Sequence, residues 1–108
     1  PIRDWGWAPE FMQGVIKIGE LDHPENLILS TGIGASLQDF VDYCFELVGL
    51  NSSDFVEIDP KGLDTGVDIS VGDPTKARNL INWDPKFTWR NVAENMLAHD
   101  IKTLNSIN

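Results

Sequence analysis

The chain has 108 residues, 42% of them hydrophobic, so it can bury one modest core and has no room for a second domain. Its 17 acidic residues outnumber the 8 basic ones, and the net charge of −9 disfavours nucleic acid and anionic membranes as partners. The single cysteine, Cys44, excludes an internal disulfide and a cysteine-based zinc site. With no apolar run near the ~20 residues that span a bilayer and no secretory signal, we expect a cytoplasmic location.

A helix and a strand are predicted in the first third of the chain. Ala8-Pro9-Glu10 favours a helix start, because proline suits the first helical position and an acid there favours the helix dipole. Residues 27–31 then show the pattern of a short strand, bounded by Gly32. The helix over 9–18 is expected to bury one apolar stripe, formed by Phe11, Met12, Val15 and Ile16.

A capping pattern marks the second helix. Ser36 and Asp39 are spaced so that each side chain can accept a hydrogen bond from the other residue's backbone N–H, and Gly49 is a suitable end. Apolar residues follow the cap at helical spacing, which predicts the face turned to the core. This face consists of Leu37, Phe40, Val41, Cys44, Phe45 and Val48.

The second half is expected to hold two strands and two helices. Residues 55–58 and 67–71 favour strands, the second from its alternation of apolar and polar side chains. Asp73-Pro74 favours a helix start, and Thr88 caps a final helix. The inner positions of these helices are Ala77, Leu80 and Ile81, then Trp89, Val92, Met96, Leu97, Ile101 and Leu104. The fold class predicted for 1–108 is therefore a small α/β or α+β unit with few short strands and about four helices.

A glycine-containing loop offers one candidate cofactor site. The segment 32–37, Gly-Ile-Gly-Ala-Ser-Leu, follows a predicted strand and opens a predicted helix, as a dinucleotide-binding fingerprint requires. Leu37 stands where the fingerprint has its third glycine, and no complete βαβ unit surrounds the loop. A capped strand-to-helix turn is the favoured interpretation, so no cofactor-binding residue is predicted here.

Catalytic and metal-binding groups are not predicted elsewhere. The acids Asp39, Asp42, Glu46, Asp54 and Glu57 fall on predicted polar faces or loops, where solvated surface is the better interpretation. The two histidines lie far apart without companion ligands, and no Gly-x-Ser-x-Gly elbow is present.

Arg3 is the one candidate for a binding residue. It lies among Ile2, Trp5 and Trp7 in a sequence with only three arginines. A guanidinium fork beside aromatic rings is well suited to phosphate oxygens. An ion pair with Asp4 or another acid is equally compatible with the spacing, and both interpretations stay open at this point.

Four segments resemble one enzyme family, in the order in which the family has them. Residues 1–8, Pro-Ile-Arg-Asp-Trp-Gly-Trp-Ala, are similar to the Arg-Asp-Trp-Gly-His-Ala segment of GDP-mannose 4,6-dehydratases. Residues 30–41 resemble the family's Thr-Gly loop and capped helix, and residues 71–86 its Gly-Asp-x-Thr-Lys-Ala and Leu-x-Trp-x-Pro segments. Residues 98–100, Ala-His-Asp, match its final helix, so the likeness covers nearly the whole chain.

The resemblance implies a C-terminal substrate-binding subdomain of an extended short-chain dehydrogenase/reductase. Arg3, as the arginine of the Arg-Asp-aromatic segment, would contact the diphosphate of a GDP-mannose-like nucleotide sugar. The family's NADP would be bound by an N-terminal Rossmann domain that is absent from this chain. The chain, which begins at Pro1, is thus expected to be a fragment that has no catalytic residue, cofactor or metal of its own.

Three positions depart from the family pattern. Family members carry an Arg-Pro-x-Glu-Val segment whose arginine and acid grip the nucleotide, whereas this chain has Leu63 and Gly66 at those places. Trp7 replaces the usual histidine.

The only tyrosine, Tyr43, is followed four residues later by Leu47, so the family's Tyr-x-x-x-Lys proton relay is not in this chain. The particular nucleotide sugar and the direction of the reaction are left open.

Two hypotheses for the function follow. The first is the nucleotide-sugar-binding lobe of an NAD(P)-dependent dehydratase or epimerase, inactive as this fragment. The second is a degenerate, non-catalytic relative or an association module, for which four tryptophans and an apolar final helix could form a contact surface in a homo-oligomer. A free-standing dehydrogenase is disfavoured because the cofactor loop is incomplete.

Overall fold

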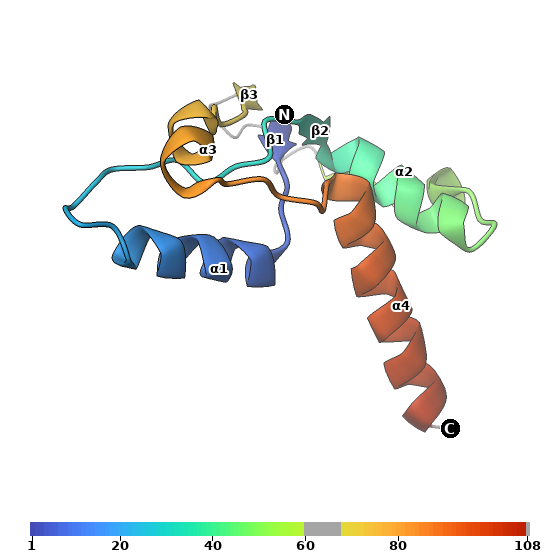
Figure 1. Ribbon diagram of the computed structural model, residues 1–108. Helices are drawn as coiled ribbons and strands as arrows, with labels where there is room; N and C mark the ends of the chain where they lie inside the picture. Colours follow the sequence, from blue (N-terminus) through green and yellow to red (C-terminus); the bar gives the residue numbers. More distant parts are fainter. Residues whose placement is uncertain (60–67, 108) are drawn as a thin grey trace.

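The computed structural model describes residues 1–59 and 68–107 of the chain. Over these residues the fold is a small α/β unit, the class that the sequence predicts. Figure 1 shows its helices spread around three short strands. In chain order the elements are β1 (Ile2–Asp4), α1 (Ala8–Gly19), β2 (Gly34–Ser36), α2 (Leu37–Leu47), the 3₁₀-helix η1 (Ser52–Asp54), β3 (Ile69–Ser70), α3 (Thr75–Ile81) and α4 (Trp89–Ile107).

The sheet is organised around its first strand. Its order is β2-β1-β3, with β1 antiparallel to β2 and parallel to β3. Arg3 is aligned with Ala35 on one neighbour and with Ser70 on the other. No prediction covered β1, because three residues are too few to show the alternation by which a strand is recognised. The start of the chain nevertheless joins two segments that lie far apart in sequence.

The predicted strands have mixed outcomes. The strand over 67–71 is confirmed at β3, and its first residue lies outside the described residues. The predictions over 27–31 and 55–58 are wrong, since neither segment belongs to a strand in the part of the chain that the structure describes. In the second of these, Phe55 and Ile58 are 61% and 63% exposed, so a strand there would have no covered face.

Trp83 forms the centre of the main core. Its ring is 4% exposed and lies at 5.5 Å, centroid to centroid, from the ring of Phe11. Its Nε1 donates a hydrogen bond of 2.8 Å to the carbonyl oxygen of Ser30, so the buried indole N–H is satisfied. Ala77 and Ile81 of α3 complete the buried cluster. Partly buried side chains pack around it, namely Phe11, Ile18, Leu21, Leu27 and Leu29.

Helix α1 buries a different stripe from the predicted one. Gly14 is buried and faces the ring of Trp83, where an added Cβ would lie 2.8 Å from Cζ3 of that ring. The helix therefore approaches the core through a glycine, which an apolar-spacing argument does not count. The predicted stripe is correct at Phe11 and wrong at its other three positions, which are more than half exposed: Met12, Val15 and Ile16.

The predicted helix starts agree well with the structure. Ser36 Oγ accepts from the Asp39 N–H at 2.9 Å, and the Asp39 carboxylate accepts from the Ser36 N–H, so the capping box is confirmed. The Asp73 carboxylate accepts from the N–H of Thr75, the first residue of α3. Three side chains predicted for the inner faces of α2 and α3 are instead exposed, namely Leu37, Val48 and Leu80. Leu37 and Val48 lie at the two ends of α2.

Helix α4 packs only through its first turns. Trp89, Val92 and Ala93 are buried, whereas Met96, Ile101 and Leu104 are 50%, 41% and 62% exposed. Figure 1 shows the C-terminal half of α4, drawn in red, extending away from the other elements. The radius of gyration is 17.0 Å, well above the value of about 13 Å for a compact domain of this length. Among the described residues, no helix combines the length and the apolarity needed to cross a membrane.

Candidate functional site

Asp4 ties the central strand to the loop that precedes β2. Its Oδ1 accepts hydrogen bonds from Thr31 N at 3.0 Å and Thr31 Oγ1 at 2.6 Å. Its Oδ2 accepts from Gly32 N at 2.8 Å. Bonds from backbone N–H groups to a carboxylate are among the stronger hydrogen bonds in proteins. The Asp4 carboxylate is therefore committed to this loop, and it holds two segments together that lie 27 residues apart.

Arg3 lies at the centre of the same sheet, next to Asp4. It is half-buried, and its Nη1 donates to the carbonyl oxygen of Ile2 at 2.9 Å. Because successive side chains of a strand point to opposite faces, Arg3 and Asp4 emerge on different faces of the sheet. The sequence left open whether Arg3 pairs with Asp4 or another acid, or binds phosphate. The three loop hydrogen bonds of Asp4 engage that carboxylate with the loop, and the phosphate-binding role of Arg3 stays a prediction.

The tryptophans around Arg3 have structural contacts of their own. Trp5 stacks on Phe40 of α2 with 5.0 Å between ring centroids, and its Nε1 donates to the Ala35 carbonyl oxygen at 3.0 Å. Trp7 lies 6.0 Å from Phe87, again between ring centroids. These contacts fix the chain directly after β1. Trp5 and Trp7 thereby hold the chain that follows Arg3 against α2 and against the segment that precedes α4.

The glycines of the loop have a packing role rather than a phosphate-binding one. Gly32 has a φ of +78°, a conformation that favours glycine. An added Cβ on Gly34 would lie 2.6 Å from Ile2 Cγ2 and 2.7 Å from Val71 Cγ2. The Asp4 carboxylate also occupies the Gly32 N–H, the kind of group that cradles a phosphate in a dinucleotide fold. The described residues of this loop do not fit a dinucleotide cofactor.

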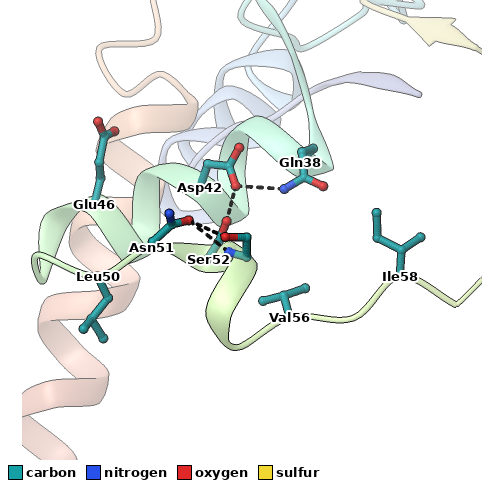
Figure 2. A pocket seen from close by; sticks show the side chains of 9 residues that line it. Gln38, Asp42, Glu46, Leu50, Asn51, Ser52, Val56 and Ile58 are labelled. Atoms are coloured by element: carbon teal, nitrogen blue, oxygen red, sulfur yellow. Dashed lines mark hydrogen bonds between the residues drawn. The ribbon is translucent and has the colours of Figure 1, made fainter.

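A pocket of about 610 Å³ lies between α2 and η1 (Figure 2). Asp42 stands in its wall and accepts hydrogen bonds from Ser52 Oγ and from Gln38 Nε2. The bond from Ser52, aided by the bond from Gln38, lowers the pKa of the Asp42 carboxyl. Asn51 Oδ1 accepts from Ser53 N and Oγ in the same turn. These polar groups satisfy one another, and the bond between Asp42 and Ser52 holds η1 against α2.

Acids and an arginine border a smaller pocket between α2 and α4. The Arg90 guanidinium lies 4.4 Å from the centroid of Trp89 and 5.9 Å from that of Tyr43, so it covers two rings. Tyr43 meets Trp89 edge-on at 5.6 Å. Tyr43 therefore contributes to the packing of α2 against α4. The residue four positions later is Leu47, not the lysine of a Tyr-x-x-x-Lys pair.

The other titratable residues considered from the sequence are not brought together. His23 and His99 are exposed and lie in different parts of the chain. Burial raises the pKa of the Cys44 thiol, which disfavours a reactive thiolate. Across residues 1–59 and 68–107, no three histidine, cysteine or acidic side chains are grouped as metal ligands would be. The departures at Leu63 and Gly66 lie outside the described residues.

Comparison with known proteins decides the family. The sequence model of the family described as GDP-mannose 4,6 dehydratase matches residues 1–96. The chain belongs to this family. GDP-mannose 4,6 dehydratase 1 of Arabidopsis thaliana is 31% identical over 93% of the chain and 28% of its own length. GDP-mannose 4,6-dehydratase of Sinorhizobium fredii is 31% identical over 94% and 34%. The chain thus spans about a third of the length of these relatives.

Three of the four segments that resemble the GDP-mannose 4,6-dehydratase family meet in space. Asp4 of the first segment binds Thr31 of the second, and Trp83 of the third donates to Ser30. Gly72 approaches Ser30 so closely that an added Cβ would lie 2.6 Å from the serine Oγ. Family segments separated by tens of residues therefore converge on residues 30–32, next to Asp4 of β1. Sequence reasoning singled out Arg3 here but gave Asp4 only as an ion-pair partner, since its loop partners are distant in sequence.

Proposed function

We propose that the chain is the nucleotide-sugar-binding lobe of an NAD(P)-dependent dehydratase of the GDP-mannose 4,6-dehydratase kind. Membership of the family and its coverage of residues 1–96 support this proposal. The names of the relatives state that they act on GDP-mannose. A GDP-mannose-like nucleotide sugar is therefore the proposed ligand of this lobe.

The position of Arg3 is the observation that carries the proposal. Its guanidinium stems from the central strand, while the adjacent Asp4 is engaged by the Thr31–Gly32 loop. A planar guanidinium presents a fork of N–H donors that matches two phosphate oxygens at once. We assign to Arg3 the role of holding the diphosphate. The strand pairing on both sides of Arg3 and the stacking of Trp5 on Phe40 would keep the fork oriented before the ligand binds.

The remaining parts of the reaction are proposed to lie outside this chain. The glycine loop does not fit a dinucleotide, and Tyr43 packs on Trp89, so hydride and proton transfer are assigned to an N-terminal Rossmann domain that binds NADP. NADP would supply the hydride acceptor there. The role of these 108 residues is to bind and orient the nucleotide sugar and to exclude water from one side of it. By itself the chain is expected to be inactive.

Calorimetric titration of the protein with GDP, GDP-mannose, UDP-glucose and dTDP-glucose tests the proposal. Binding with a guanosine preference is expected, and Arg3→Ala should weaken it by about 10- to 100-fold, which corresponds to one charged hydrogen-bonding group. Arg3→Lys serves as the matched control: it keeps the charge but loses the fork, so an intermediate affinity is expected. Equal affinity of wild type and Arg3→Ala would contradict the role of Arg3. The absence of binding to all four ligands would contradict the lobe itself.

A non-catalytic association module is the second candidate. The observation that favours it is the number of large apolar side chains that the described residues leave exposed, on α1, around η1 and along α4. Light scattering over a wide concentration range separates the two candidates. An oligomer that dissociates on dilution, together with no nucleotide-sugar binding, would favour the module.

A further inference from the structure

The pocket between α2 and η1 has one polar, acidic side and one apolar side. From α2 it is lined by Gln38, Asp42 and Glu46, whose spacing of four residues places them on one face of that helix. Figure 2 shows apolar side chains on the side of the turn, where they are between 39% and 63% exposed: Leu50, Val56 and Ile58. From Gln38 to Glu46 the helix extends about 12 Å, so the pocket is an open groove about two helical turns long.

The groove lies in a strongly acidic part of the chain. Residues 32–59 contain six acidic residues and no lysine, arginine or histidine, whereas the other 80 residues have an excess of only three acids. Within the described residues, Glu46, Asp54 and Glu57 make no hydrogen bond or ion pair through their carboxylates. The part of the chain that the structure describes therefore leaves these three charges without a direct counter-charge.

Arg90 does not neutralise this surface by direct pairing. It lines the smaller pocket between α2 and α4, which shares Asp42 and Glu46 with the groove. Its guanidinium lies over the rings of Trp89 and Tyr43, and among the residues described it forms no salt bridge with a carboxylate. The acidic side of the groove thus remains open to a cation from outside.

The shape of the groove narrows the choice of ligand. Its carboxylates are spread along α2, and no three histidine, cysteine or acidic side chains in residues 1–59 and 68–107 are grouped as a metal ion requires. A small polycation would meet the acidic side but leave the apolar side uncovered. Nucleic acid and anionic membranes are repelled by the charge. A second copy is disfavoured for the same reason, because each chain has a net charge of −9.

We infer that the groove is a docking surface for a basic amphipathic helix of a partner protein. Lysines or arginines four residues apart on such a helix have the same spacing as Asp42 and Glu46, about 6 Å, and can pair with them. Its apolar face then covers Leu50, Val56 and Ile58. Charge complementarity and burial of the apolar side chains act together, and only a partner with both properties fits both sides of the groove.

A synthetic helical peptide of about 18 leucine and lysine residues, with leucines on one face and lysines beside them, is the probe. Fluorescence anisotropy of the labelled peptide measures its affinity for the 108-residue chain. Glu46→Lys should weaken binding by about 10-fold or more, because it places a like charge opposite the lysines of the peptide. Glu20→Lys is the matched control: it makes the same charge change at an exposed position at the end of α1, and a change of less than about 2-fold is expected.

The apolar side of the groove is tested by a second pair of variants. Ile58→Ser should weaken binding by about 5-fold, because it removes apolar surface that the peptide covers. Leu104→Ser is its control on α4, since Leu104 is 62% exposed and Ile58 is 63% exposed, and it should leave the affinity unchanged. A peptide with serine in place of leucine should bind the wild-type chain about 10-fold more weakly or not at all.

Four outcomes overturn the inference. Equal effects of Glu46→Lys and Glu20→Lys would mean that only the net charge attracts the peptide. Equal affinities of the leucine and serine peptides would identify a site for polycations in general. Self-association of the chain that is lost in Ile58→Ser would identify a second copy as the occupant. The absence of binding to the leucine–lysine peptide also overturns it, and none of these measurements uses a nucleotide, so failure here is separate from failure of the proposed function.

Discussion

The region around Trp83 and the region between α2 and α4 each contain a buried tryptophan, yet they are built differently. Trp83 is surrounded by side chains from α1, α3 and the segment 27–29, and α1 approaches it with no space for a Cβ. Trp89 lies at the start of α4, with the Arg90 guanidinium across one face, and α4 becomes exposed within two turns. The side chains of the first region are therefore packed more closely, and the second region is the more open of the two.

Replacing each tryptophan by alanine tests this contrast and has the largest expected effect. Trp83→Ala empties the centre of the core and leaves the Ser30 carbonyl oxygen without its donor, so a loss of about 3–5 kcal/mol is expected. This is a large part of the stability of any small domain. Trp89→Ala should be milder, because the helix end can relax and surface residues border the ring. Urea unfolding followed by circular dichroism measures both, and equal losses would refute the contrast.

Alanine at two glycines of α1 sharpens the description of the tighter region. At Gly14 the new Cβ would lie 2.8 Å from the Trp83 ring and 2.9 Å from Leu29 Cδ1, so the core must shift. Overpacking outweighs the better helix propensity of alanine, and a net loss of about 1 kcal/mol is expected. Gly19 is the control, since nothing lies within 4 Å of its added Cβ. Gly19→Ala should be neutral or slightly stabilising, and the same melting temperature for both variants would contradict the close approach.

The elements that sequence reasoning predicted well are those with local signals. The Ser36–Asp39 capping box and the start of α3 depend on residues within three positions of each other, and both agree with the structure. The strand β1 and the inner stripe of α1 could not be found in this way. In β1, Arg3 is aligned with Ala35 and Ser70, and in α1, Gly14 faces Trp83. These partners lie far along the chain from the residues that they meet. A glycine at a close contact carries no apolar signal at all.

The candidate site shows the same division. Arg3 stood out from the sequence because of its aromatic neighbours and then because of its match to a family motif, and its role in binding stays a prediction. The function of Asp4 depends on two backbone amides of the loop at Thr31 and Gly32, which no pattern near Asp4 indicates. The wrong prediction of a strand over 27–31 is a third case, since an alternating pattern can be read from the segment's own residues but strand pairing cannot.

The pocket between α2 and η1, which adjoins the more open region, offers the smallest effect, and this effect depends on pH. Ser52 Oγ and Gln38 Nε2 donate to Asp42 and lower its pKa below the usual value of 3.8. A carboxyl whose pKa is lowered by folding stabilises the fold above the pKa of the unfolded chain, and this contribution is lost as the pH falls through the lowered value.

Ser52→Ala removes the main cause of the lowered pKa of Asp42 and should reduce the melting temperature slightly at pH 7. The difference from wild type should stay constant down to about pH 4 and shrink below it, where Asp42 becomes protonated in both proteins. Ser53→Ala is the control, because Ser53 bonds to Asn51 rather than to Asp42. A difference that does not change with pH would mean that Ser52 stabilises the turn only through packing. In that case the contact between α2 and η1 would depend on side-chain packing, as the core around Trp83 does.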